Sequence, residues 1–286
     1  MKHVEPAGST PLLEIKDLTV SFASRAGTAT VVQGISLVVE RNQTVGIVGE
    51  SGSGKSMTSL AIMGLLPAKA ATTGSIKLQG QEILGSPERH LHKLRGERMA
   101  MVFQDPLSSL NPYYTVGKQI AEAYKAHRGG SLRAAQAVAI DAMGRVGISD
   151  PKRRVDNYPH QFSGGMRQRI MIAMAMCCEP DLLIADEPTT ALDVTVQAQI
   201  LDLMSQLQAE SGTGMVFITH DLAVVSQVSQ RVLVMNKGHV VENGTTEDVF
   251  SNPRDPYTQA LLDAIPRIDD PIRAMKKVNS GLVKEA

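Results

Sequence analysis

The sequence contains no tryptophan, only two cysteines and no apolar stretch long enough to cross a membrane. The cysteines, Cys177 and Cys178, are adjacent, so they cannot link distant segments and do not have the spacing of metal ligands. Their number favours a reducing compartment, where structural disulfides are rare. Residues 1–11 lack the apolar core of a signal peptide, and no run approaches about 18 consecutive apolar residues. If the protein acts at a membrane, another chain must supply the spanning segments.

An excess of charge of one sign is also missing. Lys and Arg together number 29, and so do Asp and Glu, which gives a formal net charge of zero. Five tyrosines and five phenylalanines leave few side chains for base stacking, so a nucleic-acid partner is not indicated. The hydrophobic fraction of 43% is sufficient for a folded core, and 286 residues fit one large domain or one domain with an insertion.

The most informative stretch matches the phosphate-binding pattern G-x-x-x-x-G-K-[ST]. It consists of Gly49, Glu50, Ser51, Gly52, Ser53, Gly54, Lys55 and Ser56. Glycines let the backbone curl so that its N–H groups surround an anion, and a helix start adds its positive dipole end. Lys55 then provides a charge for the β- and γ-phosphates of a nucleotide, and Ser56 provides a hydroxyl for Mg²⁺. We include the next residue, Met57, among the nucleotide-binding candidates.

The residues on both sides of this loop have the pattern that it requires. Residues 43–48 are a β-branched run typical of a buried strand, and residues 59–66 predict a helix that Pro67 ends. The alternative is a Gly- and Ser-rich linker that binds nothing. A strand before the loop and a helix after it favour the phosphate-binding interpretation.

Two further predicted strands end in polar side chains. Residues 182–185 are apolar and lead into Asp186 and Glu187, and residues 215–219 lead into His220. Beside a phosphate loop, Asp186 can hold Mg²⁺ and Glu187 can polarise an attacking water, although both could simply be surface acids. His220 could touch a γ-phosphate or a water.

The N-terminal residues predict an antiparallel sheet that covers the nucleotide. Its expected strands are residues 12–20 and 30–40, with Gly34 as a bulge inside the second. We predict a turn at residues 73–74, before another strand. Phe22, which follows the first strand, is either a core residue or an aromatic that stacks on adenine.

The middle of the chain changes from strand to helix periodicity. Residues 116–146 are helical in pattern and predict a helical subdomain from about residue 105 to residue 178, inserted between two strands of the sheet. Within it, Ser163 fits a helix N-cap, and Gly164 and Gly165 leave the start of that helix sterically open.

In this order and spacing, the motifs resemble those of the ATP-binding subunits of ABC transporters. The resemblance implies that Phe22 stacks on adenine, that Asp186 and Glu187 close the Walker B motif, and that His220 is the switch histidine. It also implies that Gln104 links the metal and the attacking water to a transmembrane partner. Glu187, His220 and Gln104 are therefore the catalytic candidates, and Gln104 is a metal-binding candidate as well.

The helical subdomain contains a sequence that resembles the family signature L-S-G-G-Q. Its residues are Phe162, Ser163, Gly164, Gly165 and Met166, with Phe in place of Leu and Met in place of Gln. Because the Ser-Gly-Gly centre is intact, the resemblance implies that it binds the phosphates of a nucleotide held by a second ATPase chain. Asp193, which follows Ala191 and Leu192, is implied to pair across the same dimer.

Residues 162–169, 184–195 and 252–262 resemble the oligopeptide and dipeptide importer branch, which includes importers of nickel and glutathione. The implied fold is an α/β P-loop NTPase (RecA-like) core with an N-terminal antiparallel β subdomain and an inserted α-helical signature subdomain. This nucleotide-binding domain is expected over residues 12–266, after a flexible N-terminus and before a polar tail at 267–286.

The implied activity is hydrolysis of ATP with Mg²⁺, coupled to uptake of peptides or a related small solute. The implied partners are a second, different ATPase chain, two transmembrane permease subunits and an extracytoplasmic solute-binding protein, with no nucleic acid. The implied location is the cytoplasmic face of the inner membrane. No cysteine follows Pro266, so an iron–sulfur cluster of the kind found in the tails of many branch members is not expected.

Three alternatives remain open at this point. A soluble ABC ATPase of translation or DNA maintenance would carry two such domains or long coiled coils, and neither is present in this sequence. An exporter subunit would often be fused to its permease. A module that binds nucleotide without hydrolysis would not need both Glu187 and His220.

Overall fold

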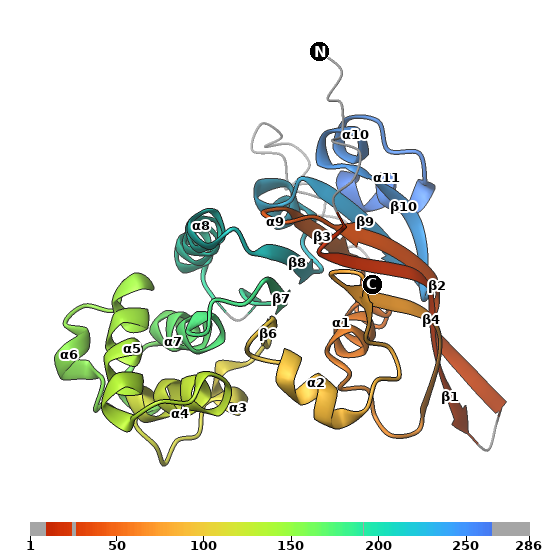
Figure 1. Ribbon diagram of the computed structural model, residues 1–286. Helices are drawn as coiled ribbons and strands as arrows, with labels where there is room; N and C mark the ends of the chain where they lie inside the picture. The colour runs from red at the N-terminus through yellow and green to blue at the C-terminus, as the bar shows by residue number, and fades with distance from the viewer. Residues whose placement is uncertain (1–9, 25–26, 191, 265–286) are drawn as a thin grey trace, which may run out of the picture.

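Two β-sheets and a group of helices form the computed structural model, which describes residues 10–24, 27–190 and 192–264 (Figure 1). The predicted flexible segment at residues 1–11 lies almost entirely outside these ranges. The predicted polar tail at residues 267–286 lies wholly outside them, so both stay predictions.

The smaller sheet is antiparallel, with the strand order β2-β1-β4-β5, as the sequence predicted for the N-terminal part of the chain. Its strands are β1 (Leu13–Ser24), β2 (Gly27–Val39), β4 (Ala70–Leu78) and β5 (Gln81–Glu82). In β2, buried Ile35, Leu37 and Val39 alternate with exposed residues, which is typical of a sheet with one face in water.

Two glycines mark irregular points in this sheet. Gly34 has a φ of 65° and lies where the pairing of β1 with β2 shifts register, so the predicted bulge is confirmed. The predicted turn at residues 73–74 is wrong, because Gly74 lies inside β4 and faces two residues of a bulge in β1. A Cβ atom there would lie 2.6 Å from the carbonyl oxygen of Lys16, so close backbone contact requires this glycine.

The larger sheet has the strand order β10-β9-β3-β8-β7-β6, and only β10 runs antiparallel to its neighbour. Its strands are β3 (Thr44–Val48), β6 (Met99–Val102), β7 (Leu182–Asp186), β8 (Gly214–Thr219), β9 (Arg231–Asn236) and β10 (His239–Thr245). Every residue of β3, β6, β7 and β8 is buried, which explains their continuous apolar runs.

Helices surround the larger sheet and fill the chain between β6 and β7. They are α1 (Lys55–Met63), α2 (Glu88–Leu94), α3 (Pro106–Ser109), α4 (Val116–Arg128), α5 (Leu132–Arg145), α6 (Pro151–Arg154), η1 (Pro159–Gln161), α7 (Gly164–Met176), α8 (Val194–Ser211), α9 (Leu222–Val228), α10 (Thr246–Ser251) and α11 (Pro256–Asp263). Helices α3 to α7 form the group at the left of Figure 1. Among the described residues, no helix has both the length and the apolar character that crossing a bilayer requires.

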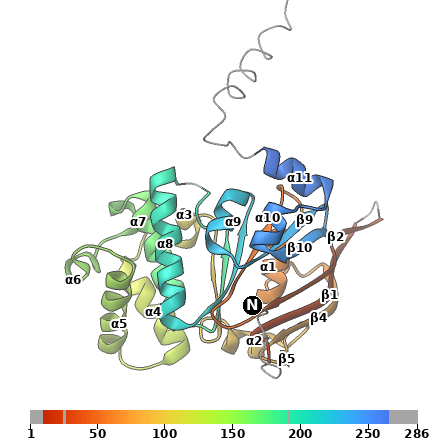
Figure 2. The same ribbon diagram turned by 90° about the horizontal axis from the view of Figure 1, so that it is seen from above.

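The core lies on both faces of the larger sheet. On one face, Leu183, Met215 and Phe217 pack against the helical group and α8. On the other face, Ile184 and Ile218 pack against α1 and the smaller sheet. Figure 2 shows the two sides, with α4, α5, α7 and α8 on the left and β1, β2 and β4 on the right. Side chains that alternate along each central strand therefore connect the helical group to the antiparallel sheet.

Phe217 gives a test of this core, because it is fully buried in β8. We expect Phe217→Ala to lower the free energy of unfolding by about 3–5 kcal/mol through loss of apolar contacts and formation of a cavity. Tyr113→Ala is the control, since Tyr113 is 84% exposed, and its cost should stay below about 0.5 kcal/mol. Urea unfolding of the full chain measures both variants, and equal effects would contradict this description of the core.

Candidate functional site

The carboxyl ends of four parallel strands meet at one edge of the larger sheet. Gly49 follows β3, His220 follows β8, Glu187 follows β7, and Gln104 comes two residues after β6. These strands are neighbours in the sheet, so residues far apart in the sequence come together at its edge. This edge is the usual place for a ligand site in an open α/β sheet.

The loop between β3 and α1 has the shape of an anion cradle. Gly54 precedes α1 with a φ of 101°, and no side chain caps the free N–H groups at the start of this helix. A Cβ atom at Gly54 would lie 2.6 Å from the carbonyl oxygen of Val31, and one at Gly49 would lie 2.1 Å from that of Met235. The glycines therefore permit close backbone packing, and the uncapped N–H groups remain available to a phosphate.

Lys55 is the cation of this loop, and only 4% of its surface is exposed. Its Nζ donates hydrogen bonds to the carbonyl oxygens of Gly49 at 2.7 Å and Glu50 at 2.8 Å. Burial lowers the pKa of Lys55, while the carboxylates of Glu187, Asp186 and Glu50 oppose that shift. A bound anion would give this buried charge a further partner.

Asp186 lies beneath the loop, at the end of β7. Its Oδ1 accepts a hydrogen bond from Ser56 Oγ at 3.2 Å, and its Oδ2 accepts one from Ser59 Oγ at 3.2 Å. Burial raises the pKa of Asp186, although both serine hydroxyls oppose the shift. A carboxylate beside a hydroxyl is an oxygen donor set that fits Mg²⁺, which takes few protein ligands and fills its shell with phosphate and water. Within the described residues, no group of three His, Cys, Asp or Glu side chains is placed to hold a metal ion.

Glu187 is the centre of a second set of contacts. Its Oε2 accepts hydrogen bonds from Gln104 Nε2 at 3.1 Å and Thr190 Oγ1 at 2.9 Å, and it lies 3.4 Å from His220 Nδ1. The backbone of Glu187 has a φ of 49°, and its N–H donates to the carbonyl of Ile218 at 2.8 Å. The sequence analysis did not identify Thr190 as a site residue. Its position three residues after Glu187 is the feature that could have indicated this contact.

A cleft of 680 Å³ joins these two sets of residues. It is lined by Val31, Glu50, Ser51, Gly52, Gly54, Lys55, Ser56, Met57, Gln104, Glu187 and His220. Gly49, Ser53 and Asp186 are buried and lie outside this lining. Val31 was not a candidate from the sequence, because only the pairing of β2 brings it to the loop.

Phe22 lies elsewhere. It is half-buried near the end of β1, where it pairs with Ala29 and Ala70 and packs against the core of the smaller sheet. It does not line the cleft. Its stacking on adenine therefore stays a prediction that rests on the resemblance alone.

The residues that resemble the signature also lie apart from the cleft. Ser163 caps α7 by accepting a hydrogen bond from Met166 N at 3.4 Å, and Asp193 caps α8 by accepting one from Val196 N at 3.0 Å. In Figure 1, α7 belongs to the helical group, and α1 lies on the other side of the central strands. Gly164 and Gly165 form the first turn of α7. Ala191 lies outside the described residues.

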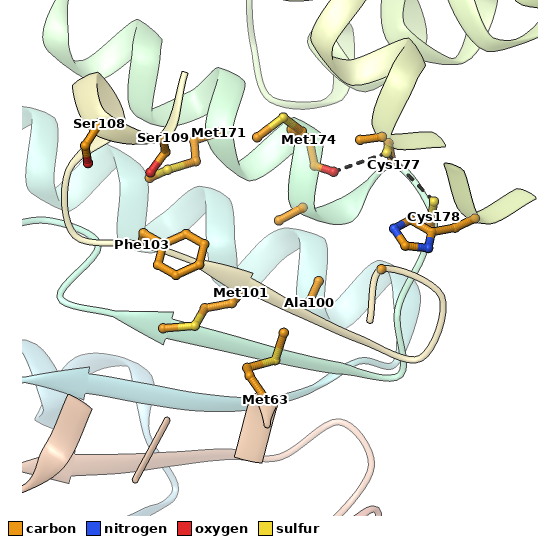
Figure 3. Close-up of a pocket in the computed structure, with 14 residues that line it drawn as sticks. Met63, Ala100, Met101, Phe103, Ser108, Ser109, Met171, Met174, Cys177 and Cys178 are labelled. Atoms are coloured by element: carbon orange, nitrogen blue, oxygen red, sulfur yellow. Dashed lines mark hydrogen bonds between the residues drawn. The ribbon is translucent and has the colours of Figure 1, made fainter. Parts of the chain in front are cut away.

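A second cavity of 510 Å³ opens between β6 and the helices α3, α4 and α7 (Figure 3). Its walls are mostly apolar and include Met101, Phe103, Met171, Met174 and the cysteine pair. Phe103 is 41% exposed in this groove and directly precedes Gln104. Cys177 and Cys178 are free thiols, and Cys178 is buried, which agrees with a packing role.

Comparison with solved structures identifies the class of protein that this geometry defines. The chain superposes with a TM-score of 0.73 on the ATP-binding cassette MJ0796, described as a dimer bound to ADP and Pi, at 25% identity over 82% of this chain and 98% of that one. It reaches the same TM-score with cbiO1 from Clostridium perfringens, at 28% identity over 85% and 92% of the two chains. The fold is that of an ATP-binding cassette.

Sequence comparisons agree with this class. The family model "ABC transporter" matches residues 32–190, and "Oligopeptide/dipeptide transporter, C-terminal region" matches residues 241–284. The chain is 50% identical to the oligopeptide transport ATP-binding protein OppD of Escherichia coli, covering 90% of this chain and 77% of OppD. It is 49% identical to the dipeptide transport ATP-binding protein DppD of Bacillus subtilis, covering 90% and 78%.

The chain belongs to the ABC transporter family, and it is an ATPase of that family. The family, the fold class and the ATPase activity predicted from the sequence are confirmed.

The raised pKa of Asp186 makes a prediction about stability. The folded protein holds the proton of this carboxyl more tightly than the unfolded chain does, so the fold loses stability as the pH rises above 3.8 and Asp186 ionises. We expect Asp186→Asn to raise the Tm of the nucleotide-free chain at pH 7 by roughly 2–4 °C, with a gain that shrinks as the pH falls toward that value.

Asp202→Asn, at an exposed position of α8, is the control and should change the Tm little at either pH. Thermal unfolding of the full chain between pH 4 and pH 7 gives the measurement. A lower Tm for Asp186→Asn at pH 7 would show that this carboxylate stabilises the empty site.

Proposed function

We propose that this chain is the ATP-hydrolysing subunit of an importer for peptides or a related small solute. The observation that carries the proposal is the convergence of Lys55 and Glu187 on one cleft, with buried Asp186 hydrogen-bonded to Ser56 of its lining, in a chain whose residues 241–284 match the C-terminal region of oligopeptide and dipeptide transporters. The relatives OppD and DppD are named as transport proteins, which argues against a soluble ATPase of translation or DNA maintenance.

In this proposal the loop of α1 holds the phosphates of ATP. The uncapped N–H groups at the start of α1 donate to phosphate oxygens, and Lys55 Nζ exchanges the carbonyls of Gly49 and Glu50 for the β- and γ-phosphates. Ser56 and Asp186 are the protein ligands of Mg²⁺, with Gln104 as a further ligand. When bound, Mg²⁺ supplies positive charge against the phosphates.

Glu187 is the proposed general base for the attacking water. Gln104 and Thr190 fix its carboxylate by hydrogen bonds to Oε2. The other oxygen, Oε1, is the one proposed to accept the proton of a water. Nδ1 of His220 lies 3.4 Å from the same carboxylate oxygen. The His220 side chain is 52% exposed at the mouth of the site, where it is suited to contact the γ-phosphate.

A second ATPase subunit completes the site in this proposal. Ser163, Gly164, Gly165 and Asp193 lie outside the cleft of their own chain. Val194, beside Asp193, is 84% exposed, so the start of α8 is accessible to another chain. We propose that the signature of each chain covers the nucleotide of its partner and that the partner is a different ATPase.

The apolar groove of Figure 3 is the proposed contact for a permease subunit. Its exposed Phe103 adjoins Gln104, whose amide donates a hydrogen bond to Glu187, so only these two residues separate a chain in the groove from the proposed base. The importer would contain two permease subunits and receive solute from an extracytoplasmic binding protein. The ATPase would then lie peripherally on the cytoplasmic face of the inner membrane.

Two variants test the proposed chemistry. Lys55→Ala should abolish ATP binding by the full chain, because the phosphates lose a partner in a poorly solvated loop.

Glu187→Gln should keep ATP binding but lower hydrolysis by the reconstituted transporter at least about 10²-fold, since it removes the base. Calorimetry measures binding, phosphate release measures turnover, and uptake of a labelled peptide measures transport. Near-normal turnover in Glu187→Gln would show that this carboxylate is not the base.

Ser163→Arg tests the shared site, because it places bulk and charge where a partner's phosphate would lie. The variant chain alone should bind ATP like the wild type, and the complex assembled with the second ATPase chain and the permeases should lose most of its turnover. If Ser163→Arg already prevents binding in the isolated chain, the shared arrangement is wrong. Full activity of the wild-type chain as a homodimer would remove the need for a different partner.

A further inference from the structure

A tyrosine of α11, near the C-terminal end of the described residues, contacts the phosphate loop. The backbone N–H of Glu50 donates a hydrogen bond of 3.1 Å to the hydroxyl oxygen of Tyr257, which lies 207 residues later in α11. Neither the motifs in the sequence nor the resemblance to transporters assigned a role to Tyr257. It is part of the region, residues 241–284, that matches the C-terminal family model.

The carbonyl group of the same loop residue, Glu50, binds the lysine of the loop. The carbonyl oxygen of Glu50 accepts a hydrogen bond of 2.8 Å from Lys55 Nζ. Glu50 is thus fixed through its N–H by Tyr257 and through its carbonyl by Lys55. The carbonyl oxygen of Gly49 belongs to the same peptide group as the N–H of Glu50, and it also accepts a hydrogen bond from Lys55 Nζ, at 2.7 Å. Hydrogen bonds at the two ends of one peptide group polarise one another, so the tyrosine hydroxyl helps to fix the position of Lys55.

The ring of Tyr257 is held in place by apolar contacts. It packs against a buried cluster that includes Val48, the last residue of β3 before the loop, together with Leu222 and Val249. Burial raises the pKa of Tyr257, and the nearby carboxylate of Glu50 adds to that effect. The hydroxyl is therefore neutral at physiological pH and has a lone pair for the N–H of Glu50.

The start of α11 is fixed by a carboxylate on β10. Glu242 accepts hydrogen bonds from the backbone N–H groups of Arg254 at 2.8 Å and Asp255 at 3.2 Å. Asp255 in turn caps the helix by accepting a hydrogen bond from Tyr257 N at 2.8 Å. Burial would raise the pKa of Glu242, but these backbone N–H groups lower it, so Glu242 stays ionised and the anchor persists at neutral pH.

We infer that Tyr257 is a positioning residue for the phosphate loop. Its hydroxyl fixes the Glu50 backbone, so that Lys55 and the N–H groups of the loop are arranged before ATP arrives. This inference rests on the proposed function in taking the loop as the nucleotide site. It goes further in making the C-terminal region a structural part of that site.

The experiment compares two Tyr→Phe variants of the full chain. Tyr257→Phe keeps the ring in its cluster and removes only the hydroxyl. We expect its Kd for ATP to rise about fivefold, the effect of one lost hydrogen bond of about 1 kcal/mol. Tyr124→Phe is the control, because Tyr124 is a half-buried tyrosine of α4 in the helical group, and its Kd should equal that of the wild type. Calorimetric titration with ATP measures both.

Two further measurements separate positioning from folding. The Tm of nucleotide-free Tyr257→Phe should stay within about 2 °C of the wild type. In the reconstituted transporter, its KM for ATP should rise severalfold while kcat at saturating ATP stays within twofold, because the hydroxyl acts on the loop backbone at Glu50 and not on the proposed base Glu187.

A rise in Kd of less than threefold would overturn the inference, and so would an equal rise in Tyr124→Phe. A larger fall in Tm would assign the effect to folding and overturn it too. Lys55→Ala, titrated in parallel, keeps the two proposals apart. If the wild type binds ATP and Lys55→Ala does not, the assignment of the nucleotide site stands, regardless of the result for Tyr257→Phe.

Discussion

A buried lysine is the constraint on which the rest of this site depends. Removing an ammonium group from water is unfavourable, and the lowered pKa of Lys55 reflects that cost. Two carbonyl oxygens of its own loop and the carboxylates of Asp186 and Glu187 partly offset it. The carboxylates that make the site chemically useful therefore also favour the charged form of the lysine when no phosphate is present.

The parallel sheet makes this compensation possible. Strands β3, β8, β7 and β6 are adjacent and end at the same edge. Strand β3 leads into the loop of the lysine, and the other three lead into the polar residues beside it. Buried apolar strands fix those ends rigidly, because the side chains of β7 and β8 alternate between two packed faces. Precision at the site therefore comes from core packing a few residues away.

Much of this could be predicted because the decisive residues are local in sequence. The phosphate loop is one continuous stretch, and Asp186 and Glu187 follow directly from an apolar strand. The features that were missed depend on contacts between distant segments. Thr190 reaches Glu187 through a turn, Val31 reaches the cleft from β2, where its carbonyl oxygen faces Gly54, and Tyr257 reaches Glu50 across more than two hundred residues. The wrong turn at Gly74 has the same origin, since only the pairing with β1 shows that the glycine belongs to a bulge.

The contact between α7 and α8 has a mechanical consequence. A Cβ atom at Gly165 would lie 2.5 Å from a methyl carbon of Val196, so the first turns of the two helices touch without space between them. Ser163 caps one helix and Asp193 caps the other. Two surface loops separated by about thirty residues therefore belong to one stiff block. A force on either loop therefore moves both loops together. A neighbouring molecule that contacts the two loops would contact one rigid unit.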